Sequence, residues 1–309
     1  MAAEIIDGAA VAAVIRAELR VRVERLREQG IVPGLAFVLV GHNPASEAYV
    51  RGKARGCEEV GIYSETVRPA PEAGPASLLE TIRELNAAPR FHGIIVQLPL
   101  PPGFDERCAT EAVTPAKDVD GLHPLNLGRL LRGDGEIMPC TPAAVRELLL
   151  RGGYDPAGKH AVIVGRSALV SKPLAMMLVQ KSPGANATVT ICHTATPDLG
   201  AITRQADILI VAAGRPGTIT AAMVKPGAVV IDVGINRIAD PSRKSGERLV
   251  GDVDFAAVRE VAGAITPVPG GVGPMTVAML LANTVAAAER TARNGAGAPK
   301  AGEAAAPYT

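Results

Sequence analysis

Three polar side chains in the N-terminal part of the chain could together support proton transfer. Tyr49 and Lys53 are four positions apart, so they share one face of a helix that follows Asn43-Pro44. Gln97 lies in the apolar run 93–98, which is typical of a short buried strand and is followed by prolines. Because a buried amide needs hydrogen-bond partners, we expect Gln97 to orient Lys53, which could then act as a general base. Each also has a simpler interpretation: an edge-strand glutamine that faces water, and a solvated helix lysine.

The segment Lys117-Asp-Val-Asp-Gly121 offers two further carboxylates, Asp118 and Asp120. Taken alone, they are typical of a turn and a helix cap, with Gly121 permitting the tight turn. Two carboxylates are too few to predict a metal site. The five histidines have no ligand-like spacing, and the cysteines are scattered without a CxxC pair: Cys57, Cys108, Cys140 and Cys192. We therefore expect no metal, and reduced cysteines as in a cytoplasmic protein.

A candidate dinucleotide site lies at 160–174, where a strand, a glycine turn and a helix follow one another. Gly165 permits a tight turn, and Ser167 is small enough for a phosphate to approach the backbone. The N–H groups at the start of the helix favour an anion. Since only the first glycine of the GxGxxG fingerprint is present, an ordinary turn between strand and helix is the alternative.

Two positions bear on the choice of cofactor. The next strand, Thr188–Cys192, ends in His193-Thr194-Ala195, without the acidic residue that binds the ribose 2′-hydroxyl of NAD. Arg166 could pair with a 2′-phosphate instead, which predicts NADP. The alternatives are a solvated Arg166 and a half-buried structural His193.

Apolar strand-like runs alternate with helical patterns, which predicts an α/β fold with mostly parallel sheets and helices on both faces. The clearest strands are Leu35–Val40, Gly93–Leu98, His160–Val164, Thr188–Cys192, Ile208–Val211 and Ala228–Val233. Helices are expected near Gly8–Gln29, Ser46–Val60, Ala76–Asn86, Pro142–Arg151, Lys172–Gln180 and Met275–Arg293. A domain boundary is expected near 138–142, where Thr141 could cap a helix with Pro142 at its first position.

We expect two domains and a tail. The helix after the loop Pro267–Pro274 has no strand behind it, so it should pack back on the first domain. This predicts a catalytic domain of residues 1–141 with 272–294 and a Rossmann-type nucleotide-binding domain of residues 142–271. A disordered, Ala/Gly/Pro-rich tail is expected over residues 295–309.

Composition limits the classes of partner. A chain of 309 residues with a net charge of +1, 3% aromatic residues and no Lys/Arg cluster does not predict a nucleic-acid surface. No apolar run approaches the length of a membrane span, and the N-terminus matches neither a signal peptide nor a transit peptide. A cytoplasmic location without membrane binding is therefore expected.

Six motifs resemble one family, the bifunctional methylenetetrahydrofolate dehydrogenase/methenyltetrahydrofolate cyclohydrolases of the bacterial type. The motifs are Tyr49-x-x-x-Lys53, Val96-Gln-Leu-Pro-Leu100, Lys117-Asp-Val-Asp-Gly121, Pro139-Cys-Thr-Pro142, Gly165-Arg-Ser167 and Thr266-Pro-Val-Pro-Gly-Gly-Val-Gly-Pro-Met-Thr276. The resemblance runs in order from the first helix to about Arg290, and six motifs in register are far more specific than any one of them.

The resemblance implies NADP-dependent oxidation of 5,10-methylenetetrahydrofolate and hydrolysis of the methenyl product to 10-formyltetrahydrofolate, by a homodimer with a folate cleft between two domains. It also implies a role in purine, methionine and histidine biosynthesis. Lys53 would be the catalytic lysine and Gln97 its partner, while Tyr49 would stack on the folate and Asp120 would hold the pterin. The implied folate site comprises Tyr49, Val96, Gln97, Leu98, Asp120, Pro269, Gly270 and Gly271, and the implied cofactor contacts are Gly165, Arg166, Ser167, Thr194 and Ile235.

Two positions depart from the family pattern. Ser171 stands where the last glycine of the GRSxxVGxP loop is expected. It could shift the packing of the helix on the strand or, as a helix cap, compensate for the change. The stretch 193–195 lacks the usual Ser-Lys or Ser-Arg, which could weaken the grip on a 2′-phosphate. Three rival readings stay open: a dehydrogenase without the hydrolytic step, an amino-acid or shikimate-type dehydrogenase, and a non-catalytic nucleotide-binding regulator.

Overall fold

The structure is a computed structural model that describes residues 2–243 and 246–296. They form two compact α/β units, which confirms the predicted fold class. Among the described residues, the first unit contains 2–17 and 118–280, and the second contains 18–117 and 281–296. Two long helices, α1 (Gly8–Glu28) and α10 (Val272–Ala296), continue from the first unit into the second. The exact limits of the domains expected above stay a prediction.

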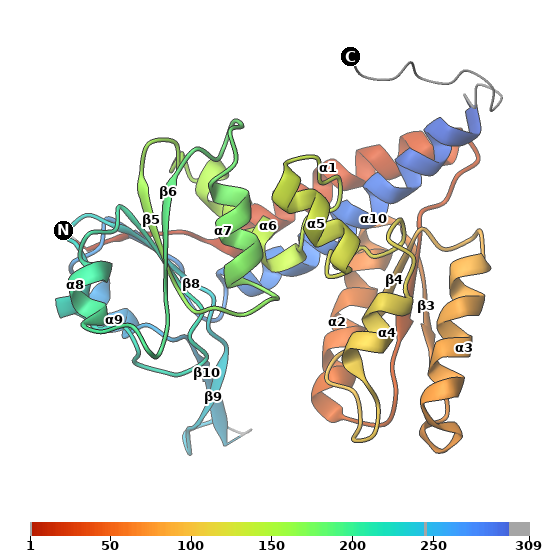
Figure 1. Ribbon diagram of the computed structural model, residues 1–309, viewed down its shortest axis with the longest axis horizontal. Helices are drawn as coiled ribbons and strands as arrows, with labels where there is room; N and C mark the ends of the chain where they lie inside the picture. Colours follow the sequence, from red (N-terminus) through yellow and green to blue (C-terminus); the bar gives the residue numbers. More distant parts are fainter. Residues whose placement is uncertain (1, 244–245, 297–309) are drawn as a thin grey trace, which may run out of the picture. The chain divides into compact units, whose positions relative to one another are not determined.

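The first unit contains a parallel sheet of six strands in the order β1-β11-β8-β7-β5-β6. The strands are β1 (Glu4–Ile5), β5 (His160–Val164), β6 (Thr188–Cys192), β7 (Ile208–Val211), β8 (Val229–Asp232) and β11 (Ala264–Ile265). Every residue of β7 is buried, as expected for a strand covered by helices on both faces. The carboxyl ends of β5, β6, β7 and β8 lie at one edge of this sheet, because neighbouring parallel strands run in the same direction (Figure 1).

Short helices connect these strands and cover the sheet. They are α5 (Pro124–Arg132), α6 (Cys140–Arg151), α7 (Ser171–Leu178), α8 (Leu199–Thr203), η2 (Ala221–Met223) and α9 (Phe255–Val258), and a hairpin of β9 (Asn236–Ala239) and β10 (Glu247–Val250) follows β8. Helix α6 begins at Cys140 with Pro139 at the cap and no side-chain cap, so the prediction that Thr141 caps it is wrong. The Cys140 N–H is instead bound by the Asp120 carbonyl at 3.3 Å, which starts the helix earlier.

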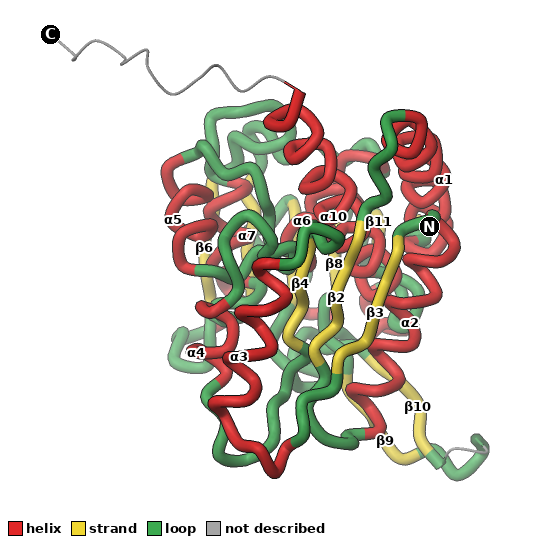
Figure 2. Tube along the Cα trace, turned by 90° about the vertical axis from the view of Figure 1, so that its right-hand side faces the viewer, coloured by secondary structure: helices red, strands yellow, loops and turns green. Residues whose placement is uncertain are grey.

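The second unit contains a parallel three-stranded sheet in the order β3-β2-β4 (Figure 2). Its elements are β2 (Gly34–Val38), α2 (Pro44–Val60), β3 (Tyr63–Val67), η1 (Pro71–Ala73), α3 (Gly74–Ala87), β4 (Gly93–Val96) and α4 (Glu106–Ala112). All of β2 is buried because it is the central strand. Strand β3 has no fully buried residue, and its mixed polar sequence explains why the apolar pattern did not predict it.

The C-terminal part of α10 packs in the second unit, beside α1 (Figure 1). Arg22 of α1 donates two hydrogen bonds to the Glu289 carboxylate, at 2.9 and 2.8 Å. This confirms that the last helix returns to the N-terminal part of the fold. Helix α10 extends to Ala296, and the tail expected over 295–309 stays a prediction, because residues 297–309 lie outside the described residues.

The prediction that no apolar run approaches the length of a membrane span is wrong for helix α10. Within the described residues, the stretch Val272–Arg293 is long and apolar enough to cross a membrane, with a mean hydropathy of 1.3. In the 18-residue window of this stretch to which that hydropathy refers, 56% of the residues are buried inside the protein, which is also the pattern of a core helix.

Candidate active site

The lysine and glutamine singled out from the sequence are hydrogen-bonded in the second unit. Lys53 is half-buried on α2, and its Nζ donates to Gln97 Oε1 at 3.1 Å. Gln97 directly follows β4, where its backbone N–H donates to the Val38 carbonyl at 2.9 Å. The Gln97 Nε2 donates to the Leu98 carbonyl at 2.7 Å, so the amide oxygen is left to face Lys53. Only 8% of Gln97 is exposed, and the interpretation of a water-facing glutamine is wrong.

Helix α2 presents Tyr49, Lys53 and Cys57 at successive turns. The helix starts after Asn43, whose side chain accepts hydrogen bonds from the N–H groups of Ala45 and Ser46. Tyr49 is 52% exposed, whereas Cys57 is fully buried. Burial raises the pKa of Cys57 to about 12, so its thiol stays protonated and is a poor nucleophile. The exposed Tyr49 ring can stack on a planar ligand beside Lys53.

Val96 and Leu98 flank Gln97 and are both half-buried. They are the last residue of β4 and the second residue after it, so the polar Gln97 lies between two apolar side chains in the sequence. The Leu98–Pro99 peptide bond is cis. This segment therefore combines apolar surface with one oriented amide.

The two carboxylates of the Lys117–Gly121 segment have different environments in the first unit. Asp118 is buried, and it accepts hydrogen bonds from the His123 N–H and from Asn126 Nδ2, both at 2.8 Å. Burial raises the pKa of Asp118, although these donors oppose the shift. Asp120 is only half-buried. Asp118 thus fits the interpretation that it stabilises a turn and the start of a helix. Asp120 is the more accessible acid of the two.

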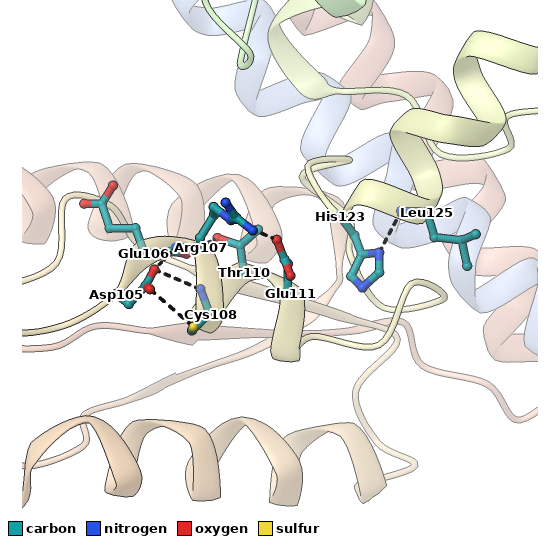
Figure 3. Close-up of polar contacts among 8 residues, drawn as sticks. All are labelled: Asp105, Glu106, Arg107, Cys108, Thr110, Glu111, His123 and Leu125. Atoms are coloured by element: carbon teal, nitrogen blue, oxygen red, sulfur yellow. Dashed lines mark hydrogen bonds and ion pairs between the residues drawn. The ribbon is translucent and has the colours of Figure 1, made fainter.

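Helix caps account for other polar side chains that could suggest chemistry (Figure 3). Asp105 accepts hydrogen bonds from the N–H groups of Arg107 and Cys108, at 2.8 and 3.1 Å, and starts α4. Hydrogen bonding to the Asp105 carboxylate raises the pKa of the exposed Cys108 thiol. His123 Nδ1 accepts from the Leu125 N–H at 3.0 Å and starts α5 in the first unit. These contacts are helix caps and include none of the predicted site residues.

The turn after β5 has the geometry expected of a nucleotide-binding loop. Gly165 has a φ of 136°, and a Cβ placed there would lie 2.3 Å from the Ala212 carbonyl oxygen, so no side chain fits. Arg166 and Ser167 are exposed directly after it. The Ser167 Oγ accepts from the N–H groups of Val170 and Ser171, at 3.1 and 3.4 Å, at the start of α7.

Ser171 does not act as the cap that its position suggested. It is the first residue of α7, fully buried, and its hydroxyl has no hydrogen-bond partner. A Cβ at Gly165 would lie 2.7 Å from the Ser171 Oγ, so the hydroxyl packs against the glycine turn. The Ser167 hydroxyl instead accepts the N–H groups of Val170 and Ser171, and α7 has no side-chain cap on its N-cap residue, Val170.

Thr194 and Ile235 lie at the same sheet edge as the Gly165 turn. Thr194 is exposed after β6, and Ile235 is 51% exposed after β8. The carboxyl edge of a parallel sheet is the usual position of a nucleotide. An exposed arginine, a turn without a side chain and two exposed loop residues at this edge fit a dinucleotide.

The loop Pro269-Gly270-Gly271 joins β11 to α10 and packs against the start of α1. The Gly270 carbonyl accepts from the Ala9 N–H at 3.0 Å, and a Cβ at Gly8 would lie 1.9 Å from the Gly271 carbonyl oxygen. Pro269 is exposed and Gly271 is buried. The loop is held by backbone contacts, which leaves Pro269 accessible to a ligand.

Two buried carboxylates near the carboxyl edge of the six-stranded sheet, Asp232 and Asp252, were not predicted from the sequence as part of a site. Asp232 ends β8, and Asp252 follows β10. Asp232 is a charged residue inside the apolar run predicted as the strand Ala228–Val233, which is a signal of the same kind as Gln97. Asp252 follows Gly251 and has no such signal, because aspartate and glycine are common in loops.

Other features do not coincide with the predicted residues. A pocket of about 480 Å³ lies at the opposite, amino edge of the six-stranded sheet and is lined by Lys159, Asp207 and Lys225 among others. Within residues 2–243 and 246–296, no cluster of three or more His, Cys, Asp or Glu side chains could hold a metal ion. The expected absence of a metal stays a prediction.

Comparison with known proteins identifies relatives over nearly the whole chain. The family model "Tetrahydrofolate dehydrogenase/cyclohydrolase, catalytic domain" matches residues 6–120, and the model of the NAD(P)-binding domain of the same family matches residues 139–292. A "Bifunctional protein FolD" from Chlorobium limicola is 56% identical over 289 residues, which cover 93% of this chain and 98% of the relative. A protein of the same name from Moorella thermoacetica is 56% identical over 290 residues, covering 94% of this chain and 100% of the relative.

Solved structures agree with this similarity. A bifunctional methylenetetrahydrofolate dehydrogenase/cyclohydrolase from Campylobacter jejuni has a TM-score of 0.88 and 46% identity, covering 94% of this chain and 100% of that chain. The dehydrogenase-cyclohydrolase of Trypanosoma brucei, solved with NADP cofactor and an inhibitor, has a TM-score of 0.88 and 42% identity. The match covers 95% of this chain and 99% of that one.

Proposed function

The chain belongs to the tetrahydrofolate dehydrogenase/cyclohydrolase family, and we propose that Lys53, oriented by Gln97, is its proton-transfer residue. The protein is a bifunctional enzyme of folate one-carbon metabolism. It oxidises 5,10-methylenetetrahydrofolate with NADP and hydrolyses 5,10-methenyltetrahydrofolate to 10-formyltetrahydrofolate. The three rival readings of the sequence are therefore set aside.

The 3.1 Å hydrogen bond between Lys53 and Gln97 is the observation that carries the proposal. A lysine on an exposed helix face samples many rotamers, whereas this one is half-buried and bound to an amide that is itself fixed by the Leu98 carbonyl. Holding a proton acceptor in one position makes transfer effectively intramolecular. Gln97 is thus proposed as the residue that orients Lys53.

Hydrolysis follows from this arrangement. Water attacks the methenyl carbon to form a C–O bond, and the neutral Lys53 Nζ accepts a proton from the water. The hydroxyl group on that carbon then loses its remaining proton as the C=O bond forms and the bond to N5 breaks; N5 keeps the electron pair and takes a proton, and the formyl group stays on N10. One water is consumed and one proton is released. The cationic substrate disfavours a second positive charge beside it, which favours the neutral amine of Lys53 over the ammonium.

The cofactor is NADP, and we propose that it is held at the carboxyl edge of the six-stranded sheet. When bound, NADP⁺ accepts the hydride of the methylene bridge. The Gly165 turn lets a phosphate approach the backbone, Ser167 offers a hydroxyl beside it, and Arg166 offers a cation. Thr194 and Ile235 are proposed to contact the cofactor from the loops after β6 and β8.

The folate contacts are proposed from the family motifs and the exposure of each residue. Tyr49 would stack on the ligand, and Asp120 would accept hydrogen bonds from the amino and ring N–H groups of the pterin. Val96, Leu98 and the Pro269–Gly271 loop would supply apolar and backbone contacts. The homodimer, the cytoplasmic location, the absence of nucleic-acid and membrane partners, and roles in purine, methionine and histidine biosynthesis also stay predictions from the resemblance and composition.

Replacing Lys53 with methionine tests the proposal. The variant should lose about 10²–10⁴-fold in methenyltetrahydrofolate hydrolysis, because it lacks the proton acceptor, and should still bind NADP⁺. Arg55→Met is the matched control, because Arg55 is an exposed cation on the same helix. Hydrolysis by the Lys53 variant at the parent rate would show that Lys53 is a surface lysine with no part in the reaction.

A further inference from the structure

Asp252 is fully buried, and its carboxylate is hydrogen-bonded to two loops near the carboxyl edge of the six-stranded sheet, where NADP is proposed to bind. Its Oδ2 accepts hydrogen bonds from the N–H groups of Ala213 and Gly214, at 2.6 and 2.8 Å, in the loop that follows β7. Its Oδ1 accepts from Asn236 Nδ2 at 2.8 Å, at the start of β9. One carboxylate therefore ties the loop after β7 to the segment after β8.

Asp232 completes the same network from the end of β8. It is 3% exposed, and its Oδ1 accepts from the N–H groups of Gly234 and Asp252, both at 3.0 Å. Its Oδ2 accepts from the Val253 N–H at 2.9 Å. The carboxylate of Asp232 thus fixes the backbone that carries Asp252.

The glycines around this network are required by space. A Cβ at Gly251 would lie 1.8 Å from Asp232 Oδ2, and a Cβ at Gly234 would lie 2.3 Å from Asp252 Oδ1. Any side chain at either position would displace a carboxylate. The two acids and the two glycines therefore form one tightly packed junction.

This junction of two acids and two glycines is linked to the backbone next to two predicted cofactor residues, Gly165 and Ile235. Ala212 precedes the bound pair Ala213–Gly214, its N–H donates to the Val164 carbonyl at 2.8 Å, and its own carbonyl packs against Gly165. Ile235 lies between Gly234, which is bound by Asp232, and Asn236, which is bound by Asp252. A shift of either carboxylate would therefore move the Gly165 turn and the exposed Ile235 side chain.

We infer that Asp252 and Asp232 are positioning residues for the dehydrogenase reaction, because they set the two loops against which NADP is bound. The inference rests on the cofactor contacts proposed above for Gly165 and Ile235. The Asp252 carboxylate binds only the loop after β7 and Asn236, whereas the Asp232 backbone N–H also donates to Thr266 Oγ1 at 2.8 Å, ahead of the proposed folate loop Pro269–Gly271. We therefore expect the hydrolytic reaction to be independent of the Asp252 side chain, and the test uses that residue.

A carboxylate is needed at Asp252 because both of its oxygens accept hydrogen bonds. An asparagine at position 252 keeps one acceptor oxygen and replaces the other with an NH₂ group. That NH₂ group would face either the N–H groups of Ala213 and Gly214 or the NH₂ group of Asn236. In either orientation two donors face each other in a buried site. Asp252→Asn should therefore loosen the loops without removing any group that touches a ligand.

The two reactions of the enzyme provide the test. Asp252→Asn should raise the KM for NADP⁺ and the Kd for NADP⁺ by about tenfold or more, and should leave methenyltetrahydrofolate hydrolysis without cofactor within about twofold of the parent. Asp207→Asn is the control, because Asp207 precedes β7 at the opposite edge of the sheet. It should leave both reactions unchanged.

Equal losses in both reactions, or an unchanged KM and Kd for NADP⁺, would overturn the inference. If Asp252→Asn does not fold, Asn236→Ala is the second variant: it keeps the carboxylate and removes the two hydrogen bonds that the half-buried Asn236 side chain donates, to Asp252 Oδ1 and to the Gly251 carbonyl. It should raise the KM for NADP⁺ a few-fold, and an unchanged value would overturn the inference. These results are separate from the proposed function, which fails only if the Lys53 variant keeps its hydrolytic rate.

Discussion

Arg166 should determine how strongly the enzyme prefers NADP⁺ to NAD⁺. Val164 of β5 pairs with Cys192 of β6, and the Gly165 N–H donates to the Cys192 carbonyl at 2.8 Å. This register places exposed Arg166 beside the end of β6, where NAD enzymes carry an acidic residue. The chain has His193-Thr194-Ala195 there, so nothing acidic in that stretch repels a 2′-phosphate.

The size of the preference follows from the number and exposure of the cations. A hydrogen bond to a charged group contributes about 1.5–3 kcal/mol, and about 1.4 kcal/mol corresponds to tenfold in affinity. Arg166 is exposed and Ala195 supplies no second cation, so the lower end applies. Arg166→Ala should raise the KM for NADP⁺ by about tenfold and leave the KM for NAD⁺ almost unchanged.

Initial rates with each cofactor, at low and high salt, measure this effect. The parent preference should weaken at high salt, because the screening length falls from about 10 Å at 0.1 M to about 3 Å at 1 M. Lys159→Ala is the control, because Lys159 is an exposed cation just before β5, at the other end of the same strand. Equal losses with both cofactors would show that Arg166 supports the loop, and a parent preference for NAD⁺ would refute the reasoning.

Three further changes test the site and the packing. Asp120→Ala should raise the KM for folate about tenfold or more in both reactions and leave the KM for NADP⁺ unchanged, since a charge-assisted contact to the pterin is lost; an unchanged Kd for folate would assign Asp120 to loop structure. Ser171→Ala should raise the free energy of unfolding by about 1 kcal/mol, measured in urea, because the buried hydroxyl has no partner; a loss of stability would contradict this. Glu289→Gln should lower the free energy of unfolding by about 1 kcal/mol at pH 7, because hydrogen bonding to Arg22 lowers the pKa of Glu289. The ion pair stabilises the fold above the ordinary pKa of 4.5 and is lost as the pH falls through the lowered value, so parent and variant should converge in acid; a difference independent of pH would exclude this ion pair as its cause.

Local patterns in the sequence determined much of the fold. The sequence predicted β5, β6 and β7 with their observed bounds: β5 and β7 are buried apolar runs, and the edge strand β6 alternates threonine with apolar residues. The same reasoning identified the Gly165 turn. Strand β3 was missed because its mixed polar sequence has neither pattern.

The site was predictable where its chemistry is unusual for its surroundings. A glutamine inside an apolar run and a lysine one turn after a tyrosine both stand out in the sequence. Their hydrogen bond, and the burial of Gln97 to 8% exposure, depend on how α2 packs beside β4. The packing decides which of two plausible interpretations holds for each side chain.

Only the tertiary structure decided the contacts of Asp232, Asp252 and Ser171. Asp252 accepts hydrogen bonds from Ala213 and Gly214, which are 39 and 38 positions away, because β7 and β8 are neighbours in the sheet and the Asp252 backbone is bound to Asp232 at the end of β8. Ser171 was expected to cap α7, yet Ser167 accepts those N–H groups and Ser171 packs against Gly165. Periodicity and turn propensity are properties of neighbouring residues, whereas strand order and register bring distant loops together, so the sequence determined the elements and the tertiary structure determined which polar groups meet.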